Sequence, residues 1–277
     1  MDDIKQTITN QIKQTIQEAD AILITAGAGM GVDSGLPDFR GDEGFWKAYP
    51  PLKKLGLNFS QMANPKWFDT NPFLAWGFYG HRLHLYRDTI PHIGFQLLLD
   101  LVSSKKNNYF IFTSNVDGQF QKDGFDEEKI YEVHGSIHHL QCSKNCSRDI
   151  WSAKDTNVPI DAEEFLAIDI PQCPKCNQIA RPNILMFGDW DWNTKRSDNQ
   201  EARYNKWLKN NRTKKIAIIE IGAGGAIPTV SYQGEILSHR NSLATLIRIN
   251  PREYNLGGGN GYSVPLGGAQ GLKEILL

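Results

Sequence analysis

The stretch "AILITAGAGMGVDSGLPDFRG", residues 21–41, decides the fold, because it joins a short apolar run to a cluster of glycines. The apolar run, residues 21–25, predicts a buried strand. Glycines after a strand let backbone N–H groups approach phosphate oxygens, which favours a nucleotide-binding fold. The spacing is not the usual dinucleotide motif, because G-x-G-x-x-G from Gly27 would need glycine where Val32 stands. Taken alone, such a loop is more often a tight strand-to-helix turn.

The same alternation of strand and helix continues along the chain. Further buried strands are predicted at residues 109–113, 215–222 and 244–250. Helices are predicted at residues 4–18, 72–87 and 91–104. Short apolar strands separated by helices predict an α/β fold, a Rossmann-like parallel sheet with helices on both faces.

The loops at the carboxyl ends of the predicted strands are the expected ligand site, because ligands bind at that edge of a parallel sheet. We expect four loops to converge there: residues 26–41, 114–120, 222–228 and 250–254. Residues 26–60 are rich in Gly, Pro and charge and are expected to form a long irregular segment. The glycine-rich tail, residues 255–277, is expected to form a loop or hairpin and then a short helix.

Charge and hydropathy argue against several classes of protein. The 30 basic and 31 acidic residues nearly balance, which argues against direct binding of nucleic acid. The sequence has no run of 18 apolar residues, so no membrane span is expected. The first 20 residues are polar and amphipathic, unlike a secretory signal, and a cytoplasmic location is therefore expected.

All four cysteines lie in one segment, as two close pairs. They are Cys142-x₃-Cys146 and Cys173-x₂-Cys176. In a reducing compartment this clustering favours a metal over disulfides, and four thiolates suit a closed, tetrahedral, structural zinc site. The segment 136–182 also breaks the strand–helix pattern, so it is expected to be a small zinc-ribbon module inserted into a Rossmann-like domain of residues 1–135 and 183–277.

Beyond its glycines, the stretch 27–41 resembles the cofactor-binding loop of sirtuins, the NAD-dependent protein deacylases. The resemblance continues in the family's order through a series of blocks and through the four cysteines. The blocks are "TSNVDGQF" at 113–120, "VHGSIHHLQC" at 133–142, "RPNILMFGD" at 181–189, "EIGAGGAIP" at 220–228 and "IN" at 249–250. An ordered match to all the blocks is far more specific than a match to one.

The resemblance implies that NAD is the co-substrate and that zinc fills the cysteine site. The residues expected to contact NAD are Gly27, Ala28, Gly29, Asp38, Phe39, Arg40, Ser114, Asn115, Asp117, Gly222, Ala223, Gly224 and Asn250. It also explains the acid–aromatic–base cluster after the first glycines. Arg40 has a fork of donors suited to phosphate oxygens, and Phe39 would shield a developing cation from water.

The expected catalytic residues are His134, Asn115 and Asp117. His134 matches the family's catalytic His-Gly and is expected to act as general base, a task suited to a group that titrates near neutral pH. Asn115 and Asp117 match the motif after the second strand and are expected to orient a water, the ribose and the nicotinamide amide. The same two side chains would also suit turn caps, and both roles are compatible.

The implied reaction begins when the carbonyl oxygen of an acyl-lysine, on a protein or peptide, attacks C1′ of the nicotinamide ribose. His134 then helps to deprotonate a ribose hydroxyl, and the products are nicotinamide, O-acyl-ADP-ribose and free lysine. Alternatives on the same scaffold are an ADP-ribosyltransferase that acts on proteins and an NAD hydrolase. A third alternative is a non-catalytic nucleotide sensor. Retained His134 favours deacylation, and the intact set with Asn115 and Asp117 argues against a sensor.

The sequence departs from the family pattern in places that bear on the substrate. Ser114 stands where the family usually has Gln, and Ala223 and Gly224 replace two hydroxyl residues, so backbone N–H groups must carry the phosphate contact there. The loop "AIPTVSYQGE", residues 226–235, does not match the peptide-clamping pattern cleanly. The sequence therefore leaves the acyl group, the target protein and the oligomeric state open.

Overall fold

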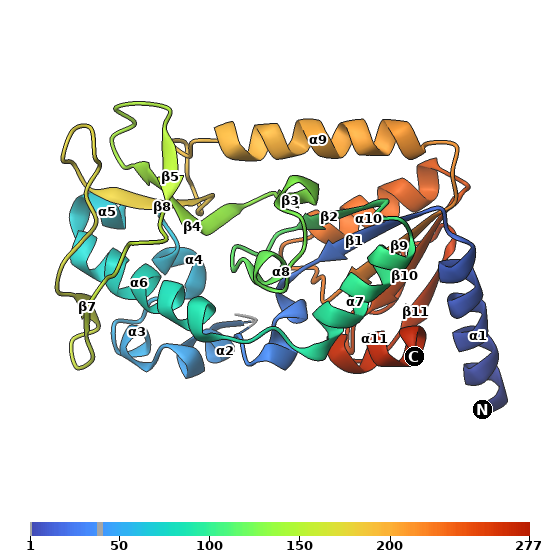
Figure 1. The fold of residues 1–277 in the computed structure, drawn as a ribbon. Helices are drawn as coiled ribbons and strands as arrows, with labels where there is room; N and C mark the ends of the chain where they lie inside the picture. Colours follow the sequence, from blue (N-terminus) through green and yellow to red (C-terminus); the bar gives the residue numbers. More distant parts are fainter. Residues whose placement is uncertain (1, 38–40) are drawn as a thin grey trace.

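A six-stranded, all-parallel sheet forms the centre of the larger part of the molecule (Figure 1). The structure is a computed structural model that describes residues 2–37 and 41–277. The strands are β1 (Ala21–Ala26), β2 (Tyr109–Thr113), β3 (Ile130–Glu132), β9 (Ile216–Ile221), β10 (Ala244–Ile249) and β11 (Gly261–Val264). Their order is β11-β10-β9-β1-β2-β3, so the direction of winding reverses between β1 and β9. Such a reversal is where ligands bind in doubly wound sheets.

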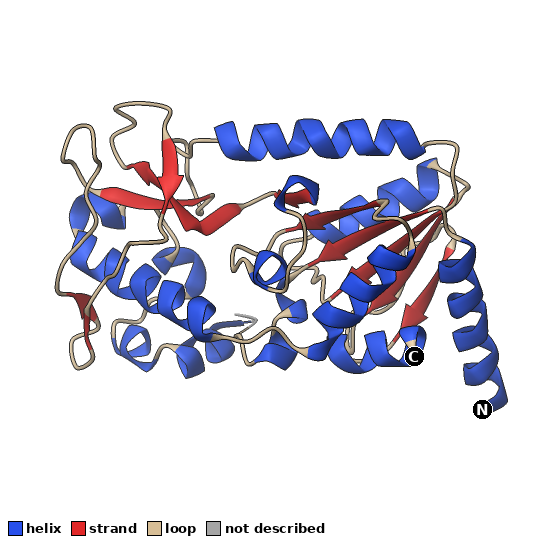
Figure 2. Ribbon diagram, in the orientation of Figure 1, coloured by secondary structure: helices blue, strands red, loops and turns tan. Residues whose placement is uncertain are grey.

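Helices cover both faces of this sheet, which explains why its central strands are continuous apolar runs (Figure 2). Every residue of β1 and of β9 is buried. One face packs against α1 (Asp2–Glu18), α7 (Ile93–Ser104) and α11 (Gly268–Leu276). The other face packs against α9 (Lys195–Asn211) and α10 (Thr229–Arg240). The predicted Rossmann-like architecture is confirmed.

A smaller part of the molecule is built around an antiparallel sheet in the order β5-β4-β8. Its strands are β4 (Gly135–Cys142), β5 (Ile150–Ser152) and β8 (Ala180–Ile184), with a separate pair β6 (Ile160–Asp161) and β7 (Leu166–Ala167). Five helices share one apolar core with these strands: α2 (Gly41–Ala48), α3 (Pro50–Lys54), α4 (Phe59–Met62), α5 (Trp67–Thr70) and α6 (Pro72–Asp88). The buried Trp76 joins the two layers, because its Nε1 donates to the Ala180 oxygen at 2.8 Å.

The packing of α2–α6 bears on the predicted domain boundaries. The insertion was predicted as residues 136–182, with residues 41–88 in the Rossmann-like domain. In the structure residues 41–88 lie against the antiparallel sheet, beside the cysteine segment (Figure 1). The division into domains remains a proposal, to which this packing adds the helices of residues 41–88.

One expectation about local structure was wrong, and another was right only in part. Residues 26–60 were expected to be irregular, yet outside 38–40 they include the 3₁₀ turns η1 (Ala28–Met30) and η2 (Val32–Ser34) and short helices. One of those helices, α4, starts at a capping box formed by Asn58 and Gln61. The tail does form a loop and then the short final helix α11, but it also contains β11, which pairs in parallel with the open edge of β10 rather than in a hairpin. The chain reaches that position through the connection at residues 250–260.

The remaining short elements are α8 (Gln119–Lys122), which follows the β2 loop, and η3 (Glu127–Lys129), which precedes β3. Among the helices of the described chain, none has both the length and the hydropathy needed to span a bilayer.

Candidate functional site

The two glycine loops meet backbone to backbone where the sheet reverses its winding. The Gly27 N–H donates to the Ile221 oxygen at 3.0 Å, and the Gly29 N–H donates to the Gly222 oxygen at 3.0 Å. A Cβ on Gly29 would lie 2.6 Å from the Cα of Gly222, which is too close for any side chain. Gly222 itself has φ of +63°, a conformation that favours glycine. The glycines are therefore required by the contact between the loops.

The loop after β2 joins the same site. The Ser114 N–H donates to the Ala26 oxygen at 3.2 Å, and Asn115 Nδ2 donates to the Gly27 oxygen at 3.0 Å. The Thr113 hydroxyl joins this loop to the first glycine loop, because it donates to the Ala26 oxygen and accepts from the Asn115 N–H. Asn115 therefore contacts the first glycine loop directly through its amide nitrogen.

Asp117 is buried, with an exposed fraction of 8%. Its Oδ1 accepts from the Gln119 N–H at 2.9 Å, a contact that closes the turn before α8. Burial raises the pKa of this carboxyl to about 6, with a smaller contribution from the nearby negative charge of Glu132. The turn-capping role considered for Asp117 is confirmed by this contact.

His134 lies half-buried in the turn between β3 and β4. Burial lowers the pKa of its imidazole below the ordinary value of 6.5, and a hydrogen bond to the Ser114 backbone opposes this shift. The lowered pKa favours the neutral form of the ring, which is the form that accepts a proton. Gly135 must follow it, because its φ is +77° and a Cβ there would lie 2.0 Å from the Asn183 oxygen.

The loops after β9 and β10 are joined by Asn250, which is fully buried. Its Nδ2 donates to the Ala223 oxygen at 2.5 Å, and its Oδ1 accepts from the N–H groups of Arg252 and Glu253, each at 3.0 Å. Asn250 therefore fixes the second glycine loop by binding the Ala223 oxygen from the buried side. All four predicted loops converge, as expected from the strand order. Asp38, Phe39 and Arg40 lie outside the described residues.

Two residues that the sequence did not single out anchor the first glycine loop. Asp33 Oδ2 accepts from the Ala269 N–H at 2.7 Å, at the start of α11. His92 bonds the Met30 oxygen through Nε2 at 2.9 Å, and its own N–H donates to the Ser34 hydroxyl at 2.9 Å. No local pattern marks these residues, because their partners lie 236, 62 and 58 positions away in the chain.

The four cysteine thiols form a compact group. Their sulfur atoms all lie within 4.8 Å of one another. Two of the separations, Cys142 to Cys176 and Cys146 to Cys173, are 3.6 Å. A tetrahedral zinc with ordinary zinc–sulfur bonds would separate its sulfurs by roughly 3.8 Å. The thiols therefore fit one zinc ion without rearrangement of the backbone.

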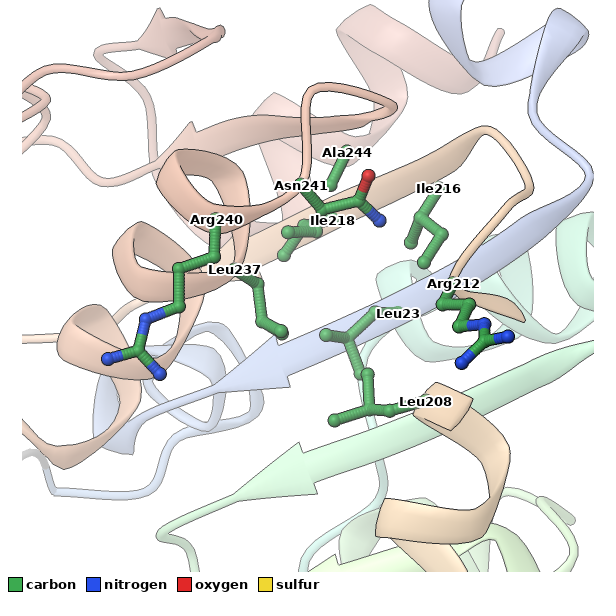
Figure 3. A pocket seen from close by; sticks show the side chains of 9 residues that line it. All are labelled: Leu23, Leu208, Arg212, Ile216, Ile218, Leu237, Arg240, Asn241 and Ala244. Atoms are coloured by element: carbon green, nitrogen blue, oxygen red, sulfur yellow. The ribbon is translucent and has the colours of Figure 1, made fainter. Parts of the chain in front are cut away.

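One cavity of about 240 Å³ lies away from this site (Figure 3). It is lined by Leu23, Leu208, Arg212, Ile216, Ile218, Leu237, Arg240, Asn241 and Ala244. Ile216 and Ala244 are the first residues of β9 and β10. The cavity thus lies at the amino ends of these strands, at the opposite edge of the sheet from the glycine loops.

Comparisons with known proteins agree with this arrangement. The model of the Sir2 family matches residues 27–216. The NAD-dependent protein deacylase 1 of Caldanaerobacter subterraneus is 30% identical over 178 residues, which cover 64% of this chain and 65% of that protein. The NAD-dependent protein deacylase of Leptospira interrogans is 28% identical over 251 residues, covering 90% of this chain and 87% of that protein. The match thus spans just under two thirds of the first relative and most of the second.

A solved structure also shares the fold. The crystal structure of a Sir2 homolog–NAD complex superimposes with a TM-score of 0.70 and 22% identity. The superposition covers 96% of this chain and 92% of that one. Both parts of the present molecule therefore have counterparts in that fold.

Proposed function

The chain belongs to the Sir2 family, and from this premise we propose that its site removes acyl groups from protein lysines at the expense of NAD. The curated relatives named above are NAD-dependent protein deacylases. The observation that carries the proposal is the meeting of four loops at the winding reversal, with the His134 imidazole against the Ser114 backbone of one of them. Such a site offers both a place for a dinucleotide and a base beside it.

The diphosphate of NAD would be held by backbone N–H groups. Gly27, Gly29 and Gly222 already donate theirs within the protein. Within residues 2–37 and 41–277, no intramolecular acceptor is seen for the N–H groups of Ala28, Ala223 and Gly224. These three therefore supply the phosphate donors in our proposal, in keeping with the missing hydroxyls of the second loop. Asn250 would act indirectly, by holding the Ala223 carbonyl.

When bound, NAD would supply a ribose C1′ that loses nicotinamide and accepts the acyl oxygen of the substrate. His134, in its neutral form, would take the proton of a ribose hydroxyl. Asn115 would use its Oδ1 to orient a water or the ribose, because its Nδ2 is held by Gly27. Asp117 would orient the nicotinamide amide from its buried position.

Two further parts of the proposal concern the surroundings of the protein. Zinc, held by the four cysteines, would stabilise the antiparallel sheet and take no part in the chemistry. Four free thiols gathered at one metal site suit a reducing compartment, so we propose a cytoplasmic location. The partner would be an acylated protein or peptide, with no direct contact to nucleic acid.

The test is an incubation of the protein with NAD and a panel of acyl-lysine peptides, followed by measurement of nicotinamide release and peptide mass. Nicotinamide release that requires the acyl-peptide, with loss of the acyl mass, supports deacylation. Release without peptide would instead indicate an NAD hydrolase. A gain of ADP-ribose mass on a protein would indicate a transferase, and ADP-ribose binding without any release would indicate a sensor.

His134→Ala is expected to lower the rate of deacylation by about 10²–10⁴-fold, the usual contribution of a general base. The exposed histidine His239, on α10, provides the matched control, because His239→Ala is expected to leave the rate unchanged. Binding of ADP-ribose should survive in both variants, as measured by calorimetry. Wild-type activity in His134→Ala would refute the assigned role.

A further inference from the structure

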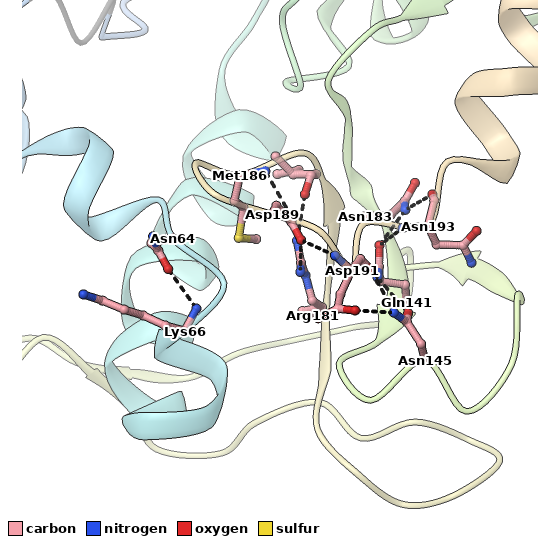
Figure 4. A network of polar contacts seen from close by, with 11 residues as sticks. Asn64, Lys66, Gln141, Asn145, Arg181, Asn183, Met186, Asp189, Asp191 and Asn193 are labelled. Atoms are coloured by element: carbon pink, nitrogen blue, oxygen red, sulfur yellow. Dashed lines mark hydrogen bonds and ion pairs between the residues drawn. The ribbon is translucent and has the colours of Figure 1, made fainter.

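A buried ion pair holds the β8–α9 loop, residues 185–193 (Figure 4). The side chains of Arg181 and Asp189 have exposed fractions of 2% and 0%. Arg181 Nη1 donates to Asp189 Oδ1 at 3.0 Å, and Nη2 donates to Oδ2. Arg181 Nη2 also donates to the Ile184 oxygen at 2.9 Å. The guanidinium thus donates both to the Asp189 carboxylate and to the Ile184 backbone oxygen just before the loop.

One end of the β8–α9 loop is tied to His134. The Leu185 N–H donates to the His134 oxygen at 2.9 Å. Asp189 Oδ2 accepts from the Met186 N–H at 3.2 Å, so the carboxylate that pairs with Arg181 also holds the residue next to that bond. The position of the His134 backbone therefore depends on the loop.

The other end of the loop is tied to the segment that carries two of the cysteines (Figure 4). Gln141, next to Cys142, donates from Nε2 to the Asp191 oxygen at 2.9 Å. Asn145, next to Cys146, donates from Nδ2 to the same oxygen at 3.0 Å. The loop thus spans from the metal-binding turn to His134, with the Arg181–Asp189 pair between them.

A buried ion pair contributes little net stability, because the cost of removing two charges from water offsets their attraction. A two-pronged arginine–carboxylate contact does fix geometry, because both partners are planar and both bonds are directional. We propose that Arg181 and Asp189 are positioning residues. They hold the β8–α9 loop in the arrangement that fixes the backbone position of His134, and they couple His134 to the metal-binding turn, residues 142–146.

The first test measures hydrogen–deuterium exchange of the zinc-loaded protein. Asp189→Asn keeps the size of the side chain and removes its charge, and it is expected to raise exchange of residues 185–193 and 133–137 about tenfold. The matched control is Glu220→Gln, which breaks another buried pair, with Arg248, at exposed fractions of 1% and 6%. That control is expected to lower the melting temperature without changing exchange of the β8–α9 loop. Unchanged exchange in folded Asp189→Asn would overturn the proposal.

The second test is kinetic and rests on the proposed deacylase function. Asp189→Asn is expected to lower kcat about tenfold while the Kd for ADP-ribose stays within about twofold of wild type, because the glycine loops are separate from the pair. Arg181→Lys should recover part of the kcat that Arg181→Met loses. Equal losses in kcat and ADP-ribose binding would overturn the positioning role. If the wild-type protein shows no deacylation, the proposed function fails, and the exchange experiment still decides the present inference.

The coupling to the metal-binding turn has its own readout. Removal of zinc by a chelator is expected to raise exchange of residues 185–193 in the wild-type protein, and a loop that stays protected would overturn the coupling. Should Asp189→Asn fail to fold, Asn145→Gly replaces it. Asn145 is exposed and has φ of +47°, which glycine tolerates. Its loss should raise exchange at the Asp191 end of the loop, and unchanged exchange would count against the proposal.

Discussion

Gly29 shows how a missing side chain positions a site. Without a Cβ, the backbone of the first glycine loop rests on that of Gly222, and the Gly29 N–H donates to the Gly222 oxygen. Neither loop has the spacing of a dinucleotide motif, so their function depends on this contact. The contact leaves the neighbouring N–H groups of Ala28 and Ala223 without intramolecular acceptors in the described part of the chain.

Gly29→Ala is therefore expected to destabilise the protein by about 1–3 kcal/mol, the usual cost of overpacking, and to weaken ADP-ribose binding. Its Cβ would meet backbone atoms of Gly222, which cannot rotate away. Gly44→Ala is the matched control, because Gly44 lies in α2 with no atom within 4 Å of the added methyl. Denaturant unfolding should show the control to be neutral or more stable by about 0.5–1 kcal/mol. Equal stability of the two variants would contradict the packing argument.

Asp117 makes stability depend on pH. Its pKa is raised to about 6 in the folded protein, so folding favours the protonated carboxyl. The resulting contribution to stability is fully present below the unfolded pKa of about 3.9. This stabilisation is lost as the pH rises through 6, at a cost on the order of 2–3 kcal/mol. Asp117→Asn should therefore gain stability over wild type between pH 4.5 and pH 7.5.

The measurement is the denaturant midpoint of Asp117→Asn against wild type at about pH 4.5, 6 and 7.5, a range that brackets the folded-state pKa. The control is Glu163→Gln, which changes an exposed carboxylate and should show no such trend. A gain that is constant with pH would indicate that burial of the charge is not the cause. We expect Asp117→Asn to lose deacylase activity. The wild-type carboxylate lowers stability at neutral pH, which indicates that it serves the reaction rather than the fold.

Among the secondary-structure elements, the starts of two distant helices hold the first glycine loop in place. The η2 turn supplies Asp33 to the start of α11, and the residue before α7, His92, bonds both η1 and η2. His92 Nδ1 also accepts from the Gly94 N–H at 2.9 Å and caps α7. The loop is therefore fixed by the ends of two helices that pack on the same face of the sheet.

Asp33→Ala tests this anchoring. It removes an acceptor from the amino end of α11, where an oxygen is favoured by the free N–H groups and the helix dipole. We expect a loss of about 1 kcal/mol in the free energy of unfolding. Asp33→Asn keeps an acceptor and should lose less than half of that amount. Urea unfolding distinguishes the two variants, and the anchoring idea fails if Asp33→Ala unfolds like wild type.

At the scale of the whole molecule, the Rossmann-like part and the antiparallel sheet meet along the chain segments that carry the site. His134 lies between β3 of the first sheet and β4 of the second. The helix α9 leaves the antiparallel sheet and packs along the parallel one (Figure 1). Unfolding of the antiparallel sheet should therefore disturb the position of His134.

Metal removal is the corresponding test. A metal held by the four thiols would cross-link the end of β4 to the segment before β8, and such binding adds to folding stability. Chelation, or Cys173→Ser, should lower the melting temperature by about 5 °C or more. Ser143→Ala, next to Cys142, is the control for a change beside the ligands and should stay close to wild type. A melting temperature that chelation leaves unchanged would refute a structural zinc.

Much of this architecture was predictable from the sequence. Strands β1, β2, β9 and β10 are short apolar runs with glycine or turn residues after them, and the helices predicted at 4–18, 72–87 and 91–104 correspond to α1, α6 and α7. The cysteine pairs predicted a common site, and the four thiols do lie together. Strand β11 and the helices of residues 41–62 were not predicted. Their local pattern is weak, and packing against β10 and α6 decides them.

The strand–helix alternation, the glycine loops, the four cysteines and the family can be recognised from residue type and spacing along short stretches of the chain. The folded structure is needed to show that Gly29 rests on Gly222, that burial raises the pKa of Asp117, and that Arg181 and Asp189 hold a loop against His134. These features depend on distances and burial, which arise when segments far apart in the chain pack together, and no local pattern records which segments those will be.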